Sequence, residues 1–194
     1  MIKKTFSAAV LMLALGAPAW AADEPRAVSA IQASSPDANL QLFNAIQKQV
    51  LGYSQFSIFD SVHAQIDNGV VALTGKVTMP YKRNDIEKRV AKVAGVSRVV
   101  NRIDVLPVSQ FDDELRFRIA RAIYGNANFR SYGSRVNPPI HVIVEHGRVT
   151  LEGVVNSNVD RMIARSIASS FSSFGPVTNA LKTDAEAKAE LEKL

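Results

Sequence analysis

An eleven-residue pattern occurs twice in this chain, and it limits the fold more than any other feature. It reads DNGVVALTGKV at residues 67–77 and EHGRVTLEGVV at residues 145–155. When residues 62–105 are aligned with residues 140–183, 9 of the 44 positions are identical, whereas average residue usage predicts about 3. The identical pairs are His63/His141, Gly69/Gly147, Val71/Val149, Leu73/Leu151, Gly75/Gly153, Val77/Val155, Arg83/Arg161, Val99/Val177 and Asn101/Asn179. The chain therefore contains a duplicated structural unit.

A second set of matches lies upstream of each pattern, at a separation of 73 residues instead of 78. It pairs Leu42, Ile46, Val50, Gly52 and Phe56 with Leu115, Ile119, Ile123, Gly125 and Phe129. The difference predicts a five-residue insertion in the second unit, within residues 130–140. Gly133, Pro138 and Pro139 predict that this insertion is a loop.

Both units predict the same order of elements. The spacing of Leu42, Ile46 and Val50 predicts a helix, and alternating apolar residues on both sides of Asn68-Gly69 predict a β-hairpin. A second helix and a third strand, at residues 96–107, follow. The fold class expected is α+β: two tandem α-β-β-α-β domains, each a small mixed three-stranded sheet with two helices packed on one face. Gly69 and Gly147 are expected to open the turns, and Gly75 and Gly153 to allow close approach of backbone.

The N-terminus predicts export. Lys3 and Lys4 precede a short apolar run, and Ala19-Trp20-Ala21 resembles a cleavage site, so residues 1–21 are predicted to be a signal peptide. The chain has no cysteine, which excludes disulfides, a lipid anchor on cysteine and thiol catalysis. A periplasmic location without a lipid anchor is expected. Without Lys3 and Lys4 the chain keeps 21 basic and 18 acidic residues, a net charge of +3 that does not predict nucleic-acid binding.

The repeated residues resemble the BON-domain family. Its pattern joins a turn glycine, a V-x-L-x-G-x-V strand and a later G-V-x-x-V-x-N-x-[IL] segment. Unit one matches it with Gly69, Val71, Leu73, Gly75, Val77, Gly95, Val96, Val99, Asn101 and Ile103. Unit two matches with Gly147, Val149, Leu151, Gly153, Val155, Val177, Asn179 and Leu181, but Ser173 and Phe174 replace the Gly-Val pair. Phe174-Gly175-Pro176 is expected to form the turn there.

The resemblance implies the layout of OsmY-type periplasmic proteins, which have two BON domains. The expected organisation is a flexible segment at residues 22–36, domains at residues 37–108 and 109–183, and a C-terminal tail at residues 184–194 that forms a short frayed helix. The family is implicated in binding phospholipid membranes and in maintaining the cell envelope under osmotic stress, and some members are discussed as chaperone-like. Two functions therefore remain open: binding of anionic phospholipid surfaces, or chaperone-like binding of unfolded envelope proteins.

Two helices carry the candidate binding residues. Residues 81–92 present Lys82, Arg83, Lys88 and Arg89, either as an ordinary solvated face with an Asp85–Arg89 pair or as a basic face for lipid phosphate. Residues 159–174 have two apolar ridges, and one of them is expected to suffice for the core. The second ridge, with Ile163, Ile167 and Phe174, is expected to cover the other unit or to meet a membrane or client, beside Arg161 and Arg165.

The remaining recurring polar residues predict structure, not chemistry. His63 and His141 are expected on the solvent side of each sheet, with no third ligand for a metal. Asn101 and Asn179 are expected to bond to backbone from the last strand. No catalytic or phosphate-binding motif is present, so neither an enzyme nor a cofactor is expected. Oligomeric state is not predicted by the sequence.

Overall fold

The structure is a computed structural model that describes residues 36–172 and 174–192. The predicted signal peptide, and all but Pro36 of the segment predicted to be flexible, lie outside the described residues. Repeat 1 (residues 36–108) contains α1 (Pro36–Leu51), β1 (Ser61–Asp67), β2 (Val70–Val77), α2 (Pro80–Val90) and β3 (Arg98–Val105). Repeat 2 (residues 109–192) contains α3 (Gln110–Gly125), η1 (Ala127–Phe129), α4 (Arg130–Gly133), β4 (Ile140–Glu145), β5 (Arg148–Val155), α5 (Asn158–Ser169), β6 (Thr178–Thr183) and α6 (Asp184–Leu191).

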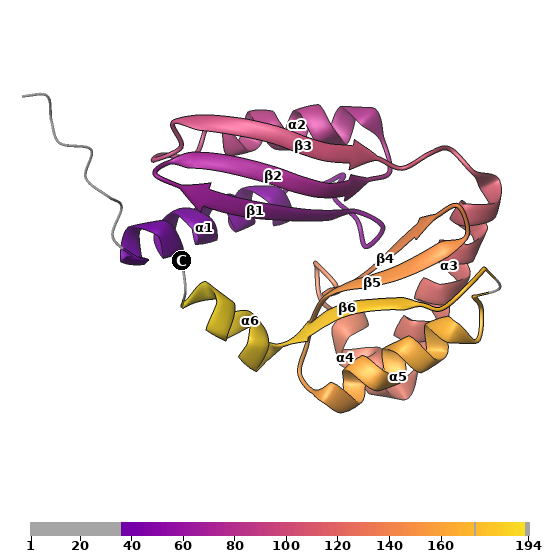
Figure 1. The fold of residues 1–194 in the computed structure, drawn as a ribbon. Helices are drawn as coiled ribbons and strands as arrows, with labels where there is room; N and C mark the ends of the chain where they lie inside the picture. The colour runs from indigo at the N-terminus through magenta and orange to yellow at the C-terminus, as the bar shows by residue number, and fades with distance from the viewer. Residues whose placement is uncertain (1–35, 173, 193–194) are drawn as a thin grey trace, which may run out of the picture. The chain divides into compact units, whose positions relative to one another are not determined.

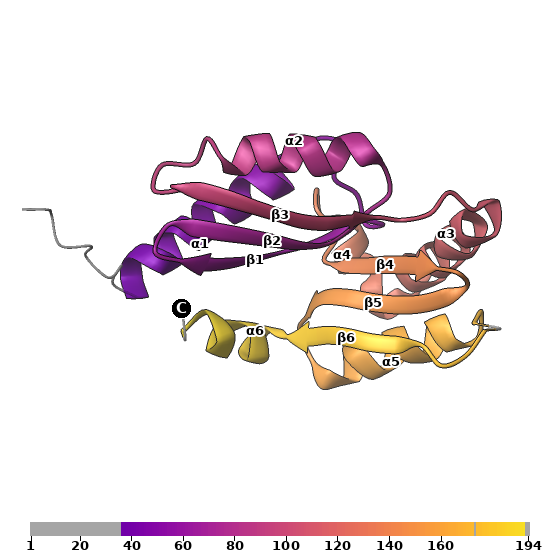
Figure 2. The ribbon, with the colours of Figure 1, turned by 45° about the horizontal axis from the view of Figure 1, so that its top comes forward.

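Each repeat has the mixed three-stranded sheet that the sequence predicts. The strand orders are β1-β2-β3 and β4-β5-β6 (Figures 1 and 2). The hairpin strands are antiparallel, while the last strand runs parallel to the central one after a helical crossover. Equivalent residues are paired in both sheets, with Ala64 opposite Leu73 and Val142 opposite Leu151. The duplication in sequence is therefore a duplication of register as well as of fold.

The hairpin turns explain the first repeated glycine. Asn68 and Gly69 have φ values of 48° and 77°, and His146 and Gly147 have 51° and 74°. Two consecutive positive φ values define a type I′ turn, which matches the twist of the flanking strands. Glycine adopts such values without a steric penalty.

The second repeated glycine lies where backbone approaches backbone. A Cβ atom on Gly75 would lie 2.2 Å from the carbonyl oxygen of Ser61, and one on Gly153 would lie 1.9 Å from that of Pro139. The central strand twists against the start of the first strand at this point, so any side chain would force the two strands apart.

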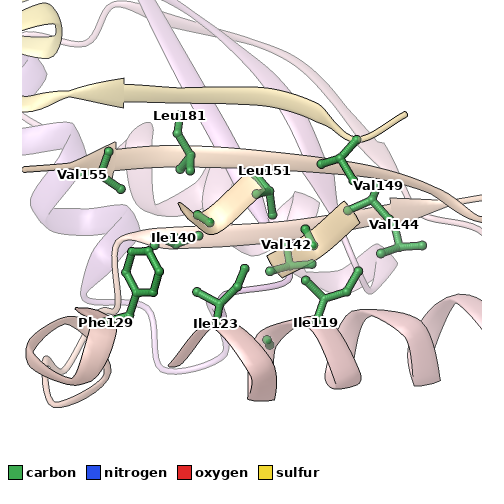
Figure 3. Close-up of a cluster of buried hydrophobic side chains, with 14 of the residues drawn as sticks. Ile119, Ile123, Phe129, Ile140, Val142, Val144, Val149, Leu151, Val155 and Leu181 are labelled. Carbon is green, nitrogen blue, oxygen red and sulfur yellow. The ribbon is translucent and has the colours of Figure 1, made fainter. Parts of the chain in front are cut away.

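Each repeat has its own apolar core between its sheet and its two longest helices. In repeat 2 the stripe of α3 packs against the inner faces of β4 and β5, and Figure 3 shows Ile119 and Ile123 of α3 directed toward the sheet. Ala164 and Ala168 of α5 complete this core. In repeat 1 the equivalent contacts come from Ile46 and Val50 of α1 and from Ile86 and Val90 of α2.

The insertion in repeat 2 is more ordered than the loop that the sequence predicts. It begins with α4, directly after η1, and it buries Tyr132 beside Phe129 in the core. The Tyr132 hydroxyl accepts the N–H of Asn156 at 2.8 Å and donates to Asp160 at 3.0 Å. The prediction of a loop was therefore wrong for residues 130–133, because glycine and proline signals did not reveal the buried aromatic ring.

The C-terminal helix is fixed to repeat 2 by a capping box. The Thr183 side chain accepts the N–H of Glu186, and the Glu186 carboxylate accepts the N–H of Thr183. Such reciprocal bonds satisfy the free amides of a first turn. Among the described residues, no helix has the length and apolar character that crossing a membrane requires.

Candidate functional site

Lys82 does not lie on the exposed basic face that the sequence suggests. Its ammonium group is 2.7 Å from a carboxylate oxygen of Asp60, and the two side chains are 7% and 0% exposed. Asp60 also accepts the backbone N–H groups of Ser57 and Thr78, each at 2.8 Å. Burial alone would raise the pKa of Asp60, but the bonds from Lys82, Thr78 and Ser57 hold it below its usual value. Lys82 is thus a structural residue whose charge is neutralised inside the protein.

The other basic residues of α2 differ in their accessibility. Arg83 and Lys88 are exposed, whereas Arg89 is partly buried and stacks over the ring of Tyr53 at 4.7 Å. The Tyr53 hydroxyl donates to Asp85 at 2.7 Å, so Asp85 and Arg89 both contact Tyr53. Burial and the Asp85 carboxylate raise the pKa of Tyr53 to about 12. Of the four basic residues predicted on this helix, only Arg83 and Lys88 are therefore exposed.

The second apolar ridge of α5 packs against the core of repeat 2. Ile163 and Ile167 are partly buried and contact that core, together with Phe171. The expectation that one ridge suffices for the core was wrong, because Ile163 and Ile167 pack against it beside the buried Ala164 and Ala168. Met162 and Val159 are the exposed apolar side chains of α5, 69% and 63% exposed.

The remaining candidates of repeat 2 separate into paired and free residues. Arg161 forms an ion pair with Glu186 at 3.0 Å, while Arg165 is exposed. Phe174 is 61% exposed. Gly175 has a φ of 110° in the segment where the sequence predicts a turn.

Phe174 belongs to an exposed aromatic surface that sequence reasoning did not find. Its ring meets that of Phe111 edge to face, with centroids 5.5 Å apart. Phe111 is 53% exposed, and Val108 beside it is 96% exposed. We call Val108, Phe111 and Phe174 the aromatic surface. Elsewhere on α3, the Arg118 guanidinium lies 5.4 Å from the centre of the Phe171 ring. Phe111 continues the spacing by four of Leu115, Ile119 and Ile123 toward the N-terminus of α3, so the sequence pattern gave no signal that its ring is exposed.

A shallow pocket of about 250 Å³ lies within the aromatic surface. Pro107, Val108, Phe111 and Phe174 form its apolar wall. Asp112 lies beneath it and is only 1% exposed. Its carboxylate accepts the N–H groups of His146 and Gly147, each at 2.8 Å. These bonds fix the turn of the β4–β5 hairpin to the first turn of α3, next to Phe111.

Polar contacts join the two repeats. Glu152 of β5 accepts bonds from Ser61 and from His63 of β1, the latter at 2.8 Å. Lys76 of β2 pairs with Glu145 of β4. A cleft of about 640 Å³ lies here, and its lining includes His63, Lys76, Glu145, Glu152, Asp104, Arg148 and Thr178. The bond from His63 is the largest cause that lowers the pKa of Glu152.

His141 is not on a solvent-facing sheet surface as predicted. It is partly buried, its ring lies 5.6 Å from that of Phe56 in repeat 1, and its Nδ1 atom is buried without a hydrogen bond within the described residues. Burial lowers the pKa of His141, although Asp60 and Glu152 oppose this effect. His63 is the exposed member of the pair.

We expect acidification to destabilise the fold through His141. Above the ordinary pKa of 6.5 the histidine is neutral in both folded and unfolded chains; below it the unfolded chain binds a proton that the folded chain does not. Stability should therefore fall as the pH decreases from 6.5 toward the lowered pKa of the folded state. Urea denaturation at several pH values from neutral to mildly acidic should show a smaller loss for His141→Gln than for the parent. Equal losses in the two proteins would contradict this assignment.

The recurring asparagines fix the last strand to the second helix. Asn101 Nδ2 donates to the carbonyl of Arg83 at 3.0 Å, and Asn179 Nδ2 donates to that of Arg161 at the same distance. Gly95 has a φ of 94° just before β3. Within the described ranges, no group of three or more His, Cys, Asp or Glu side chains forms a metal site.

The arrangement defines a class of protein: two tandem α+β domains that share one topology. The model of the BON domain matches residues 44–107 and 112–185. The chain therefore belongs to the BON-domain family, with two tandem copies, and BON domains are generally non-enzymatic binding domains.

Two further comparisons add little to this assignment. No curated protein matches the chain significantly. One solved structure with similarity comes from structural studies of CdsD, a structural protein of the type III secretion system of Chlamydia trachomatis. It is 13% identical, covers 78% of this chain and 97% of its own, and has a TM-score of 0.27. That similarity is too low to support any statement about this protein.

Proposed function

We propose that this protein is a non-catalytic component of the periplasm that binds phospholipid membranes and helps to maintain the cell envelope under osmotic stress. The aromatic surface of repeat 2 is the binding site. The single observation that carries the proposal is the exposed contact between Phe111 and Phe174, with Val108 beside it. Large apolar patches are rarely left exposed unless they meet a partner or a membrane.

The chemistry of the aromatic surface fits a lipid interface. Phenylalanine rings gain free energy by entering the acyl region, at about 1.5–3 kcal/mol for a fully buried side chain. Arg118, on the same helix as Phe111, is exposed and lies over the Phe171 ring, and it supplies a cation for lipid phosphate. A basic residue near an anionic membrane contributes about 1 kcal/mol, and salt screens this contribution. Arg165 is an exposed cation of the same repeat and Arg83 one of repeat 1.

Co-sedimentation with liposomes tests the proposal. We expect binding to vesicles that contain phosphatidylglycerol and weaker binding to phosphatidylcholine alone, and high salt should weaken only the binding to phosphatidylglycerol. Phe111→Ser and Phe174→Ser should each lower the affinity roughly tenfold, because each removes a ring from the interface. Val136→Ser is the matched control, since Val136 is 97% exposed on a loop outside the aromatic surface.

The proposal fails under two outcomes. Either no binding to any vesicle is observed, or Phe111→Ser and Phe174→Ser bind like Val136→Ser while keeping the parent's thermal stability. Exposed Phe174 should tolerate the substitution, because surface changes are usually within about 0.5 kcal/mol.

A further inference from the structure

The outer edge of β4 in repeat 2 is closed by groups from within the chain. Val142 N–H donates to the carbonyl of Ile58, in the segment before β1, at 2.8 Å. Arg116 of α3 donates to the carbonyl of Val144 at 3.2 Å. The Tyr124 hydroxyl accepts the N–H of Ile140 at 3.0 Å and donates to its carbonyl. The three outward-facing residues of this edge strand are therefore all engaged.

The equivalent edge in repeat 1 is open. Val62, Ala64 and Ile66 hold the positions of Ile140, Val142 and Val144, with the same pairing to the central strand, so their backbone groups also point away from the sheet. Within residues 36–172 and 174–192, no hydrogen bond from outside the sheet reaches these groups.

The sequence of α1 explains why the edge is open. At the separation of 73 residues, Phe43 and Leu51 of α1 correspond to Arg116 and Tyr124 of α3. Neither Phe43 nor Leu51 carries a polar group, so neither is able to bond to an edge strand. Both are partly buried and lie outside the core cluster of repeat 1.

The side chains of the two edges differ accordingly. Ile140, Val142 and Val144 are all 0% exposed. Val62, Ala64 and Ile66 are only partly buried, although they face their own core in the same way. Helix α1 contacts β1 beside this edge, as Figure 1 also indicates. An open strand next to a helix with apolar side chains is the arrangement that accepts an added strand.

We propose that the β1 edge of repeat 1 binds an extended segment of another polypeptide chain, which adds to the sheet as a fourth strand. Repeat 2 indicates the chemistry of the occupant. There the edge receives a backbone carbonyl from Ile58, and the Ile58 and Phe59 side chains pack against the apolar core. A segment with alternating or adjacent apolar residues fits the β1 edge by its backbone and by contact with Phe43 and Leu51. This proposal goes beyond membrane binding and does not depend on it.

Hydrogen exchange measured by NMR on the full chain gives a direct test. In the free protein, the amide of Ala64 should exchange much faster than that of Val142. A labelled peptide that copies residues 54–61, SQFSIFDS, is the probe, because it contains the segment that the β4 edge already accepts. Adding it should slow exchange at Ala64 at least tenfold, and the same peptide methylated at alternate backbone nitrogens should bind at least tenfold more weakly in fluorescence anisotropy.

Two variants separate strand addition from apolar contact alone. Ala64→Pro removes an outward N–H from an edge strand, a position where proline is tolerated, and should weaken peptide binding at least tenfold. The double variant Phe43→Arg and Leu51→Tyr copies the closing residues of repeat 2 and should do the same. Gln41→Arg, at an exposed position of α1, is the control for the added charge and should bind like the parent.

Three results would overturn the proposal. The first is an Ala64 amide in the free protein that is as protected as that of Val142. The second is a peptide that fails to bind, or that binds without protecting Ala64. The third is unchanged affinity in both edge variants while circular dichroism shows the parent fold. Liposome binding by the Ala64→Pro variant should equal that of the parent, so failure here is distinct from failure of the membrane proposal.

Discussion

Asp60→Ala should destabilise the protein by about 3–5 kcal/mol, because it leaves the buried ammonium group of Lys82 without its partner. The substitution also removes the acceptor of the Ser57 and Thr78 backbone N–H groups. Urea denaturation monitored by circular dichroism measures the loss. A buried charge pair is costly to break from one side because the remaining charge is neither hydrated nor neutralised.

Two comparisons isolate this effect. Replacing both partners, as Asp60→Ala with Lys82→Met, should recover part of the lost stability, since no charge is then left buried. Glu190→Ala breaks an exposed ion pair with Lys182 and should cost no more than about 1 kcal/mol. If Asp60→Ala costs no more than Glu190→Ala, the structural role given to Lys82 is wrong.

Gly153→Ala is expected to cost about 2–4 kcal/mol, through positive φ and through overlap with backbone. Gly153 has a φ of 117°, and the added Cβ would lie 1.9 Å from the Pro139 carbonyl oxygen. Because the overlapping atom belongs to the backbone, the strand must move. Gly75→Ala should behave alike in repeat 1, where the corresponding distance is 2.2 Å.

Gly125→Ala is the matched control for both glycines. No atom lies within 4 Å of a Cβ atom at Gly125, which is the last residue of α3. Its stability should stay within about 1 kcal/mol of the parent, because alanine favours helix over glycine by roughly that amount. Thermal melts of the three variants decide the question, and equal melting temperatures would remove the close-approach argument.

The features that recur at fixed spacing could be predicted from the sequence. Apolar residues at every second position around Asn68-Gly69 and His146-Gly147 predicted both hairpins, because a strand with one buried face requires this alternation. The separation of apolar residues by four gave the stripes of α1 and α3. The repetition predicted that both units share one topology, because a pattern of this length rarely occurs twice by chance.

The features that depend on a single long-range contact could not be predicted. Lys82 looks like any surface lysine of a charged helix, and only its contact with Asp60, 22 positions earlier, buries it. The spacing of Ile163 and Ile167 predicted a second apolar ridge that the core does not need. Only the packed structure shows that both residues contact the core beside Ala164 and Ala168. The alignment of the two units shows Phe43 opposite Arg116. Only the structure shows that Arg116 bonds to an edge strand and that Phe43 lacks the polar group to do so.

The aromatic surface was predicted only in part: the sequence analysis named Phe174 as a candidate binding residue, but not Phe111 or Val108. The prediction placed Phe174 on a ridge with Ile163 and Ile167, which instead pack against the core. Phe111 and Val108, which complete the aromatic surface, lie at and before the start of a different helix. Their contact with Phe174 depends on how α3 and the segment after α5 meet, which periodicity within one helix does not encode.

The most direct test of membrane binding places a tryptophan in the aromatic surface. Trp20 is the single tryptophan of the chain, so Phe174→Trp in a Trp20→Phe background provides one fluorescent reporter. With vesicles that contain phosphatidylglycerol, the account predicts a blue shift of its emission and quenching by brominated acyl chains, whereas Val136→Trp in the same background should show neither. An unshifted and unquenched Phe174→Trp, under conditions in which the protein sediments with the vesicles, would contradict the account.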